Sequence, residues 1–240
     1  MWTSDTAYDR FMGRFSTRLA PVFADFAGVE AAQRVLDVGA GTGALTAELV
    51  RRRAATSAAE PAAAFVAALN ERFPSVDARE APAEALPWPD DSFDAALAQL
   101  VVSFMRDAPA GVQEMRRVAD TVAICMWDRE GMEMLAAINR ARGALGVIAQ
   151  DAAFRTREEI ESLMGDGVEM ELLEVDADYA DFEDFWDALL GGAGPAGVWA
   201  ASLAGEERAA ARAELFRQVG EPDGPFTMTG RAWAAKITRA

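Results

Sequence analysis

Hydrophobic residues follow two different spacings along the first half of the chain. An N-terminal segment repeats apolar residues at helical spacing, at Phe11, Phe15, Leu19, Phe23 and Phe26. Short β-rich runs then occupy residues 34–38, 55–59, 76–80, 93–104 and 121–127, and helical stretches lie among them at 43–53, 61–73 and 112–118. Strands that alternate with helices over this length predict a parallel sheet with helices on both faces.

The second half of the chain is less regular. It predicts helices at 131–149 and 157–164 and a strand at 169–176. A helical stretch at 182–219, broken by the glycines of 191–195, precedes a final strand at 226–237. No internal repeat and no long linker divides the chain, so we expect one domain.

Composition and charge narrow the function. The chain has 240 residues, of which 51% are hydrophobic, and its net charge of −16 disfavours a nucleic-acid partner. No histidine is present, which excludes a Ser-His-Asp triad and a His-ligated zinc, and the single cysteine, Cys125, excludes an intramolecular disulfide and a Cys-cluster metal site. We therefore expect no metal. Without a long apolar run or a secretory leader, we also expect no membrane partner and a cytoplasmic location.

The most informative segment is Asp37-Val-Gly39-Ala-Gly41-Thr-Gly43, which joins a β-rich run to a helical stretch. Closely spaced glycines let the backbone approach a ligand and present the free N–H groups of a helix start. Gly39, Gly41 and Ala44, with Glu60 further on, also satisfy the dinucleotide fingerprint. Asp37 argues against a pyrophosphate and for a positively charged amino-acid group on the ligand. The alternative is that Asp37 only caps the turn.

Four pieces together resemble the class I S-adenosylmethionine-dependent methyltransferases, in their small-molecule, methyltransferase type 11-like branch. The pieces are Leu36 to Gly43, the pair Glu60-Pro61, the segments 83–88 and 91–94, and Gln99. They cover residues 34–104 in order. The resemblance implies an α/β, Rossmann-like, doubly wound and mostly parallel seven-stranded sheet with helices on both faces and a helical cap. It assigns 1–33 to an N-terminal lid segment, 34–130 to the cofactor-binding core, 131–225 to substrate-side helices and cap, and 226–240 to the final strand.

The resemblance also implies the roles of single residues. The turn would hold the methionine part of S-adenosylmethionine, Glu60 the ribose hydroxyls, and Ala83 the adenine. The implied cofactor-binding residues are Asp37, Gly39, Ala40, Gly41, Gly43, Glu60, Pro61, Ala83, Glu84, Gln99, Tyr8 and Arg14. Structural alternatives stay open for several: a helix-start carboxylate for Glu60, a solvated acid for Glu84, a core amide for Gln99 and an amphipathic packing helix around Tyr8 and Arg14.

The acceptor would bind beyond the carboxyl ends of the strands. The expected substrate-binding residues are Ser103, Phe104, Met105, Trp127 and Trp186, and they favour a small, apolar or aromatic molecule. The aromatic spacing around Trp186 equally fits plain core packing. No catalytic residue and no oligomeric state can be named from the sequence.

Two departures from the family pattern leave alternatives open. Pro82 stands where relatives often carry an acid, and Ser103 stands where many carry a histidine. A relative that binds the cofactor without catalysis is therefore one alternative. A nicotinamide-dependent oxidoreductase is another, because the glycines and Glu60 satisfy the dinucleotide fingerprint. The expected reaction is methyl transfer by in-line displacement, in which alignment of the reacting atoms supplies much of the rate.

Overall fold

The structure is a computed structural model that describes residues 5–148, 153–192 and 194–239. The chain divides into two compact units, each assembled from segments far apart in sequence. Unit 1 comprises Met1–Phe15, Arg129–Asp151 and Glu174–Arg231; unit 2 comprises Ser16–Asp128, Ala152–Leu173 and Ala232–Ala240. The expected division into lid segment, core, cap and final strand stays a prediction.

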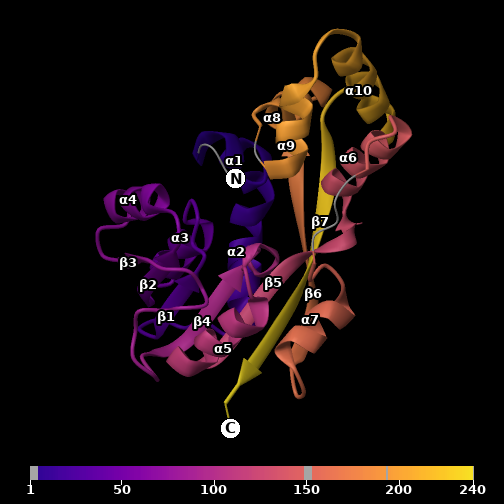
Figure 1. Cartoon of the computed structure of the whole chain (residues 1–240). Helices are drawn as coiled ribbons and strands as arrows, with labels where there is room; N and C mark the ends of the chain where they lie inside the picture. The colour runs from indigo at the N-terminus through magenta and orange to yellow at the C-terminus, as the bar shows by residue number, and fades with distance from the viewer. Residues whose placement is uncertain (1–4, 149–152, 193, 240) are drawn as a thin grey trace. The chain divides into compact units, whose positions relative to one another are not determined.

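The elements of the first half follow the expected alternation. In chain order they are α1 (Asp5–Phe11), α2 (Gly13–Ala27), β1 (Arg34–Val38), α3 (Ala44–Arg51), β2 (Ala55–Glu60), α4 (Ala63–Arg72), β3 (Asp77–Glu80), β4 (Phe93–Gln99), the 3-10 helix η1 (Val102–Phe104), α5 (Ala108–Val118) and β5 (Ala119–Met132). Figure 1 shows α3 and α4 beside the strands β1 to β3.

The second half contributes two further long strands and five helices among the described residues. They are α6 (Glu133–Ala144), α7 (Arg157–Met164), β6 (Glu169–Tyr179), α8 (Phe182–Leu190), α9 (Gly194–Ser202), α10 (Gly205–Gln218) and β7 (Phe226–Thr238). Within unit 1, α6 packs on α10, and α8 packs on both α9 and α1. These helices gather in Figure 1 around the unit 1 ends of β6 and β7.

All seven strands form one sheet in the order β3-β2-β1-β4-β5-β7-β6. The five strands from β3 to β5 pair in parallel, with Val38 opposite Ala59 and Leu97 opposite Ala123. Their connections run outward from β1 through β2 to β3 and then restart at β4, on the other side of β1. The order therefore reverses between β1 and β4, where an open α/β sheet binds its ligand.

The last two strands run against their neighbours. Side chains pair Thr121 with Thr238 and Asp128 with Trp233, so β7 is antiparallel to β5. Thr227 bonds Asp178 and Thr229 bonds Asp176 in the same opposed sense, so β6 is antiparallel to β7. The mostly parallel, Rossmann-like α/β fold expected from the sequence is confirmed.

Two predicted elements have different bounds in the structure. The strand expected at 93–104 ends at Gln99, because Leu100 takes a left-handed φ of 63° and η1 follows. The helix expected at 131–149 begins at Glu133, because β5 continues through Met132. Its predicted last residue, Ala149, lies outside the described residues.

The buried interior follows the central strands. In β1 every residue from Val35 to Val38 is buried, and β4 is buried from Ala95 to Ala98. Continuous burial on both faces is the property of a central parallel strand. Among the described residues no helix is both long and apolar enough to cross a membrane.

Candidate functional site

The turn between β1 and α3 sits at the point where the strand order reverses. The N-cap of α3 is Gly43, whose missing side chain leaves the first turn of the helix without a side-chain cap. The backbone N–H groups of such a helix start, with the positive end of the helix dipole, favour a negatively charged or hydrogen-bond-accepting ligand group.

Two glycines of this turn are required for different reasons. A Cβ at Gly39 would lie 2.5 Å from Cγ1 of Val101, so this glycine lets the turn pack closely on the segment after β4. A Cβ at Gly41 would meet only the carbonyl oxygen of Gly39, at 3.9 Å, and otherwise project into open space. The backbone at Gly41 is left-handed, with φ +53°. Gly41 therefore leaves room against the turn for a ligand. Its neighbour Ala40 is 9% exposed.

Asp37 lies buried beneath the turn, with 1% of its surface exposed. Its Oδ2 accepts a hydrogen bond of 2.6 Å from the hydroxyl of Thr46 in α3. Burial, and to a smaller extent the nearby charge of Glu60, raise the pKa of this carboxyl to about 7, although the hydrogen bond from Thr46 lowers it in part. The carboxyl therefore holds α3 to β1 and carries a charge that a cationic ligand group would stabilise.

Glu60, the last residue of β2, joins the turn directly. Its Oε2 accepts the N–H of Gly41 at 2.9 Å, and its Oε1 accepts the N–H of Ala62 at 3.0 Å. Burial raises the pKa of this carboxyl, although the two backbone N–H groups favour its ionised form. Pro61, which follows it, is exposed. The carboxylate retains further lone pairs that ribose hydroxyls can use.

The segment after β3 reaches the same edge of the sheet. Ala83 is 8% exposed, and a Cβ added at Gly111 would lie 3.3 Å from the Cβ of Ala83 and 2.6 Å from Sδ of Met105. Met105, expected to bind the acceptor, thus lies beside the alanine expected to face adenine. Glu84 accepts the N–H groups of Arg106 and Asp107 at 2.7 and 3.0 Å, so this carboxyl fixes the loop before α5.

Two buried polar atoms lack a partner where β4 ends. The amide Nε2 of Gln99 donates to the carbonyl oxygen of Ser16 at 2.9 Å, whereas its Oε1 has no partner. The hydroxyl of Ser16, in a residue 2% exposed, has none either. Because buried polar groups are rarely left unpaired, we expect these two atoms to gain a polar partner, which can be a water molecule or a ligand group. Ser16 was not among the residues expected from the sequence.

S-Adenosylmethionine fits these residues. The open space at Gly41, the carboxylate of Glu60 and the unpaired atoms of Gln99 and Ser16 offer room, an acceptor for hydroxyls and polar contacts within unit 2. The buried Asp37 carboxyl favours a cationic amino group. The individual cofactor contacts stay predictions.

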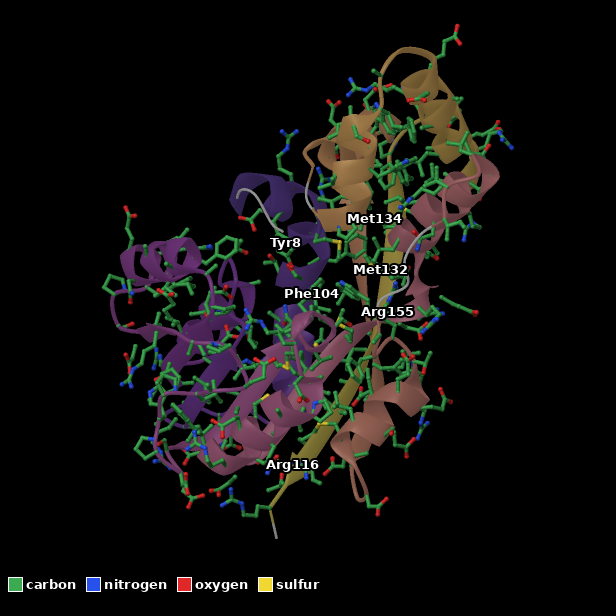
Figure 2. The ribbon with its side chains drawn as sticks, viewed as in Figure 1. Tyr8, Phe104, Arg116, Met132, Met134 and Arg155 are labelled. Atoms are coloured by element: carbon green, nitrogen blue, oxygen red, sulfur yellow. The ribbon has the colours of Figure 1, made fainter. Side chains whose placement is uncertain are left out.

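The residues of unit 2 that the sequence predicts to bind the acceptor differ in exposure. Phe104 is 57% exposed at the end of η1, whereas Trp127 in β5 is 3% exposed. The hydroxyl of Ser103 donates to the carbonyl oxygen of Ala153, fifty residues further along. Arg155, labelled in Figure 2, is 6% exposed and donates to the carbonyl oxygens of Trp127 and Asp128 at 3.2 and 3.1 Å. These long-range bonds were not visible in the sequence.

Three predicted site residues belong to unit 1. Arg14 donates to both carboxylate oxygens of Asp184, and its guanidinium lies 4.9 Å from the ring centre of Tyr179. The structure thus gives Arg14 a protein carboxylate as its partner, and pairing with a cofactor carboxylate stays a prediction. Tyr8, labelled in Figure 2, is half-buried in α1.

Trp186 lies in the aromatic core of unit 1. It is 4% exposed and stacks on Phe182 at 6.5 Å between ring centres. The hydroxyl of Tyr179 in the same core donates to Sδ of Met134, labelled in Figure 2. This position agrees with the core-packing alternative, and contact of Trp186 with an acceptor stays a prediction.

Possible metal ligands and the thiol of Cys125 were the remaining reactive groups in the part of the chain that the structure describes. No group of three or more His, Cys, Asp or Glu there has the arrangement to hold a metal ion. The thiol of Cys125 is fully buried, and burial raises its pKa far above neutrality, so the thiolate is strongly disfavoured.

Comparison with known proteins identifies the domain. Residues 36–125 match the family model described as a methyltransferase domain. The malonyl-[acyl-carrier protein] O-methyltransferase of Halorhodospira halophila is 32% identical over 133 residues, which are 53% of this chain and 45% of that protein. The chain thus spans about half the length of this curated relative.

Solved structures agree on the fold. A putative type II methyltransferase from Anaeromyxobacter dehalogenans superposes with a TM-score of 0.67 at 22% identity, over 91% of this chain and 95% of that one. A SAM-dependent methyltransferase from Aquifex aeolicus superposes with a TM-score of 0.52 at 18% identity, over 68% and 87%. The matched family model shows that residues 36–125 are a methyltransferase domain, and the glycine turn lies inside this domain at the switch point of the sheet.

Proposed function

We propose that the chain transfers a methyl group from S-adenosylmethionine to a small, apolar or aromatic molecule. The observation that carries the proposal is the bond between Glu60 and Gly41, which sets a carboxylate beside an open glycine turn at the switch point of the sheet. A carboxylate there can accept two ribose hydroxyls while the turn receives the amino-acid part of the cofactor.

In this proposal the residues of the chain bind the cofactor and orient its methyl group. The cofactor supplies an electrophilic methyl group on a sulfonium. The start of α3 and the Asp37 carboxyl hold opposite charges of the amino-acid part, and Glu60 holds the ribose. Fixing these groups positions the methyl for an incoming nucleophile, which supports in-line displacement through orientation. No side chain is assigned as a general base.

An apolar acceptor is supported by the exposed ring of Phe104 and by the negative net charge of the chain. Phe104 presents more than half of its surface beyond the end of β4, where the acceptor of an open α/β sheet binds. The net charge of −16 repels phosphate backbones, so we propose no nucleic-acid substrate. The location in the cytoplasm is part of the same proposal. The named activity of the Halorhodospira relative adds a carrier-linked acyl group to the acceptors worth testing.

Two alternatives make different predictions. A relative that has lost catalysis is motivated by Pro82, which offers no side-chain acceptor to adenine, and by Ser103. A nicotinamide-dependent oxidoreductase is motivated only by the glycine spacing. Binding of NADH or NADPH in an absorbance-monitored titration would favour it, whereas we expect none.

The test is a methylation assay with the whole chain and methyl-labelled S-adenosylmethionine. Acceptors are hydroxylated aromatics, hydroxylated aliphatics of equal size and a malonyl thioester, and both labelled product and S-adenosylhomocysteine are measured. We expect turnover with at least one aromatic acceptor, abolished in Glu60→Ala. Cofactor binding without turnover on any acceptor would favour the non-catalytic alternative.

A further inference from the structure

A short strap, defined as residues 153–156 just before α7, is fastened to the carboxyl edge of the sheet at two places. The hydroxyl of Ser103 donates to the carbonyl oxygen of Ala153, which ties the strap to the segment after β4. Arg155 donates from Nε and from one terminal nitrogen to the carbonyl oxygens of Trp127 and Asp128 in β5. The strap therefore joins η1, which follows β4, to Trp127 and Asp128 inside β5, all within unit 2.

The strap is also held from its other end. The carboxylate of Glu159 accepts the N–H groups of Arg155 and Thr156 at 2.7 and 3.2 Å, and the hydroxyl of Thr156 caps α7 by accepting the N–H of Glu159. This capping box fixes where the helix begins. Because both ends are held, the backbone of the intervening residue, Phe154, has little freedom.

Phe154 has an unusual backbone conformation. Its φ is +58°, a left-handed conformation that bulky side chains rarely adopt. The described residues contain six non-glycine positions with positive φ, at Ala32, Arg53, Asp91, Leu100, Phe154 and Glu221. The two large apolar members, Leu100 and Phe154, both lie at this edge of the sheet, after β4 and in the strap. Strained residues of this kind collect at binding sites, where surrounding bonds hold them in place.

The bond between Ser103 and Ala153 brings the backbones next to two phenylalanines together. It joins the residues that immediately precede Phe104 and Phe154. Phe104 is 57% exposed and Phe154 is half-buried, so neither ring is fully used in the core. Figure 2 labels Phe104 and Arg155, which mark the two sides of this junction.

From these contacts we infer that the strap forms one wall of the acceptor site and that Phe154, together with Phe104, selects a flat aromatic acceptor. The inference rests on the proposed function and adds to it the specificity-determining residue. A planar acceptor ring gains offset or edge contacts with phenylalanine rings that a saturated molecule of equal size cannot make. Ser103 acts in this account as a positioning residue that holds the strap.

The test separates this role from a structural one by replacing Phe154 with asparagine. Asparagine tolerates a left-handed backbone, so Phe154→Asn removes the ring and relieves the strain together. Arg53→Asn is the matched control, because exposed Arg53 has a similar φ of +64° in a turn of the same unit away from the strap. Each protein is saturated with S-adenosylhomocysteine and titrated with 2-naphthol or with its fully saturated analogue.

We expect wild type and Arg53→Asn to bind 2-naphthol more tightly than the saturated analogue. Phe154→Asn should lose about tenfold or more of the 2-naphthol affinity, close to the effect of one lost buried ring. Its melting temperature should stay equal or rise, and its S-adenosylhomocysteine affinity should not change. Ser103→Ala should give a smaller loss in the same direction.

Other results would overturn the inference. Unchanged 2-naphthol binding in Phe154→Asn would remove the residue from the acceptor site, and a lower melting temperature without a change in selectivity would make the ring structural. Wild type that binds S-adenosylhomocysteine but shows no preference for 2-naphthol would refute the aromatic wall. Failure of wild type to bind S-adenosylhomocysteine would instead count against the proposed function.

Discussion

The cofactor side and the acceptor side of unit 2 are built in different ways. The centre of the proposed cofactor side, the turn from Asp37 to Thr46, is a single short stretch of sequence, and Glu60 is joined to it at Gly41 by one bond. The acceptor side depends on bonds between distant segments, such as that from Ser103 to Ala153. A backbone turn with special geometry requires particular residue types, so its glycines and acids can be recognised in the sequence. A surface that is assembled by tertiary contacts requires no such local pattern. This contrast explains why the cofactor class is easier to infer than the acceptor.

The strongest test of this contrast replaces two glycines of the same turn. Gly39→Ala puts a Cβ within 2.7 Å of both methyl carbons of Val101 and strains a left-handed backbone, so we expect a loss of about 2–5 kcal/mol in the free energy of unfolding. Gly41→Ala meets open space and should lose only about 1–2 kcal/mol from its backbone. Urea unfolding measures both.

For ligand affinity we expect the larger direct effect in Gly41→Ala. Gly41→Ala projects into the space we assign to the cofactor, so a folded protein should lose at least about tenfold in S-adenosylhomocysteine affinity by calorimetry. Equal losses of stability in the two variants, or unchanged affinity in Gly41→Ala, would contradict the division between a packing glycine and a ligand glycine.

Asp37 provides the second test, through pH. Its folded pKa of about 7 lies above its unfolded value near 4, so between these values the native state retains a proton that the unfolded state has released. The free energy of unfolding therefore falls as pH rises from 4 to 7, by roughly 4 kcal/mol at most. Asp37→Asn has no proton to lose and keeps an oxygen for the hydroxyl of Thr46.

We thus expect the stability advantage of Asp37→Asn over wild type to grow between pH 5 and pH 8 in urea unfolding. Its affinity for S-adenosylmethionine should be reduced, because the neutral amide no longer attracts a cationic amino group. A constant difference in stability across this range would show that the Asp37 carboxyl does not titrate as proposed.

Glu60→Gln provides the third test of the cofactor side. The amide keeps one oxygen for the bond to Gly41 but loses the charge and half of the acceptor capacity. Charge-assisted bonds to ribose hydroxyls are worth about 1.5–3 kcal/mol each, so we expect S-adenosylhomocysteine affinity to fall by about 10- to 100-fold. Glu71→Gln, an exposed change in α4, is the control and should leave the affinity unchanged.

The smallest expected effect concerns unit 1. Arg14→Ala and Asp184→Ala should each destabilise the chain by about 1 kcal/mol, and the double variant by less than the sum, because the two side chains form one partly exposed ion pair. If protein pairing is the only role of Arg14, S-adenosylhomocysteine affinity stays unchanged. A large loss of affinity in Arg14→Ala alone would restore the expected contact with the cofactor.

The elements of the parallel sheet were largely predictable, because their periodicities and glycines are local properties. The strand 34–38 and the helix 157–164 occur where the sequence placed them. The end of β4 at Gln99 was missed because the apolar run continues through Val102 while the backbone turns at Leu100. Periodicity reports burial and not the φ of a single residue.

In the candidate site, too, residues with a local sequence signal could be predicted and residues placed by tertiary contacts could not. The turn and Glu60 were found because their residue types are demanded by backbone geometry and charge. Ser16 and Arg155 were missed because a serine in an amphipathic helix and an arginine before a capping box have ordinary local roles. Only the fold brings Ser16 to Gln99 and Arg155 to the backbone of β5 at Trp127 and Asp128.

The glycine turn and Glu60 are proposed to form an S-adenosylmethionine site. Calorimetric titration of the whole chain with S-adenosylhomocysteine, beside Gly41→Ala as the control, tests it most directly. We expect saturable binding of one ligand per chain in the wild type and at least about tenfold weaker binding in the variant. Equal affinity in the two proteins, or no binding by a folded wild type, would contradict it.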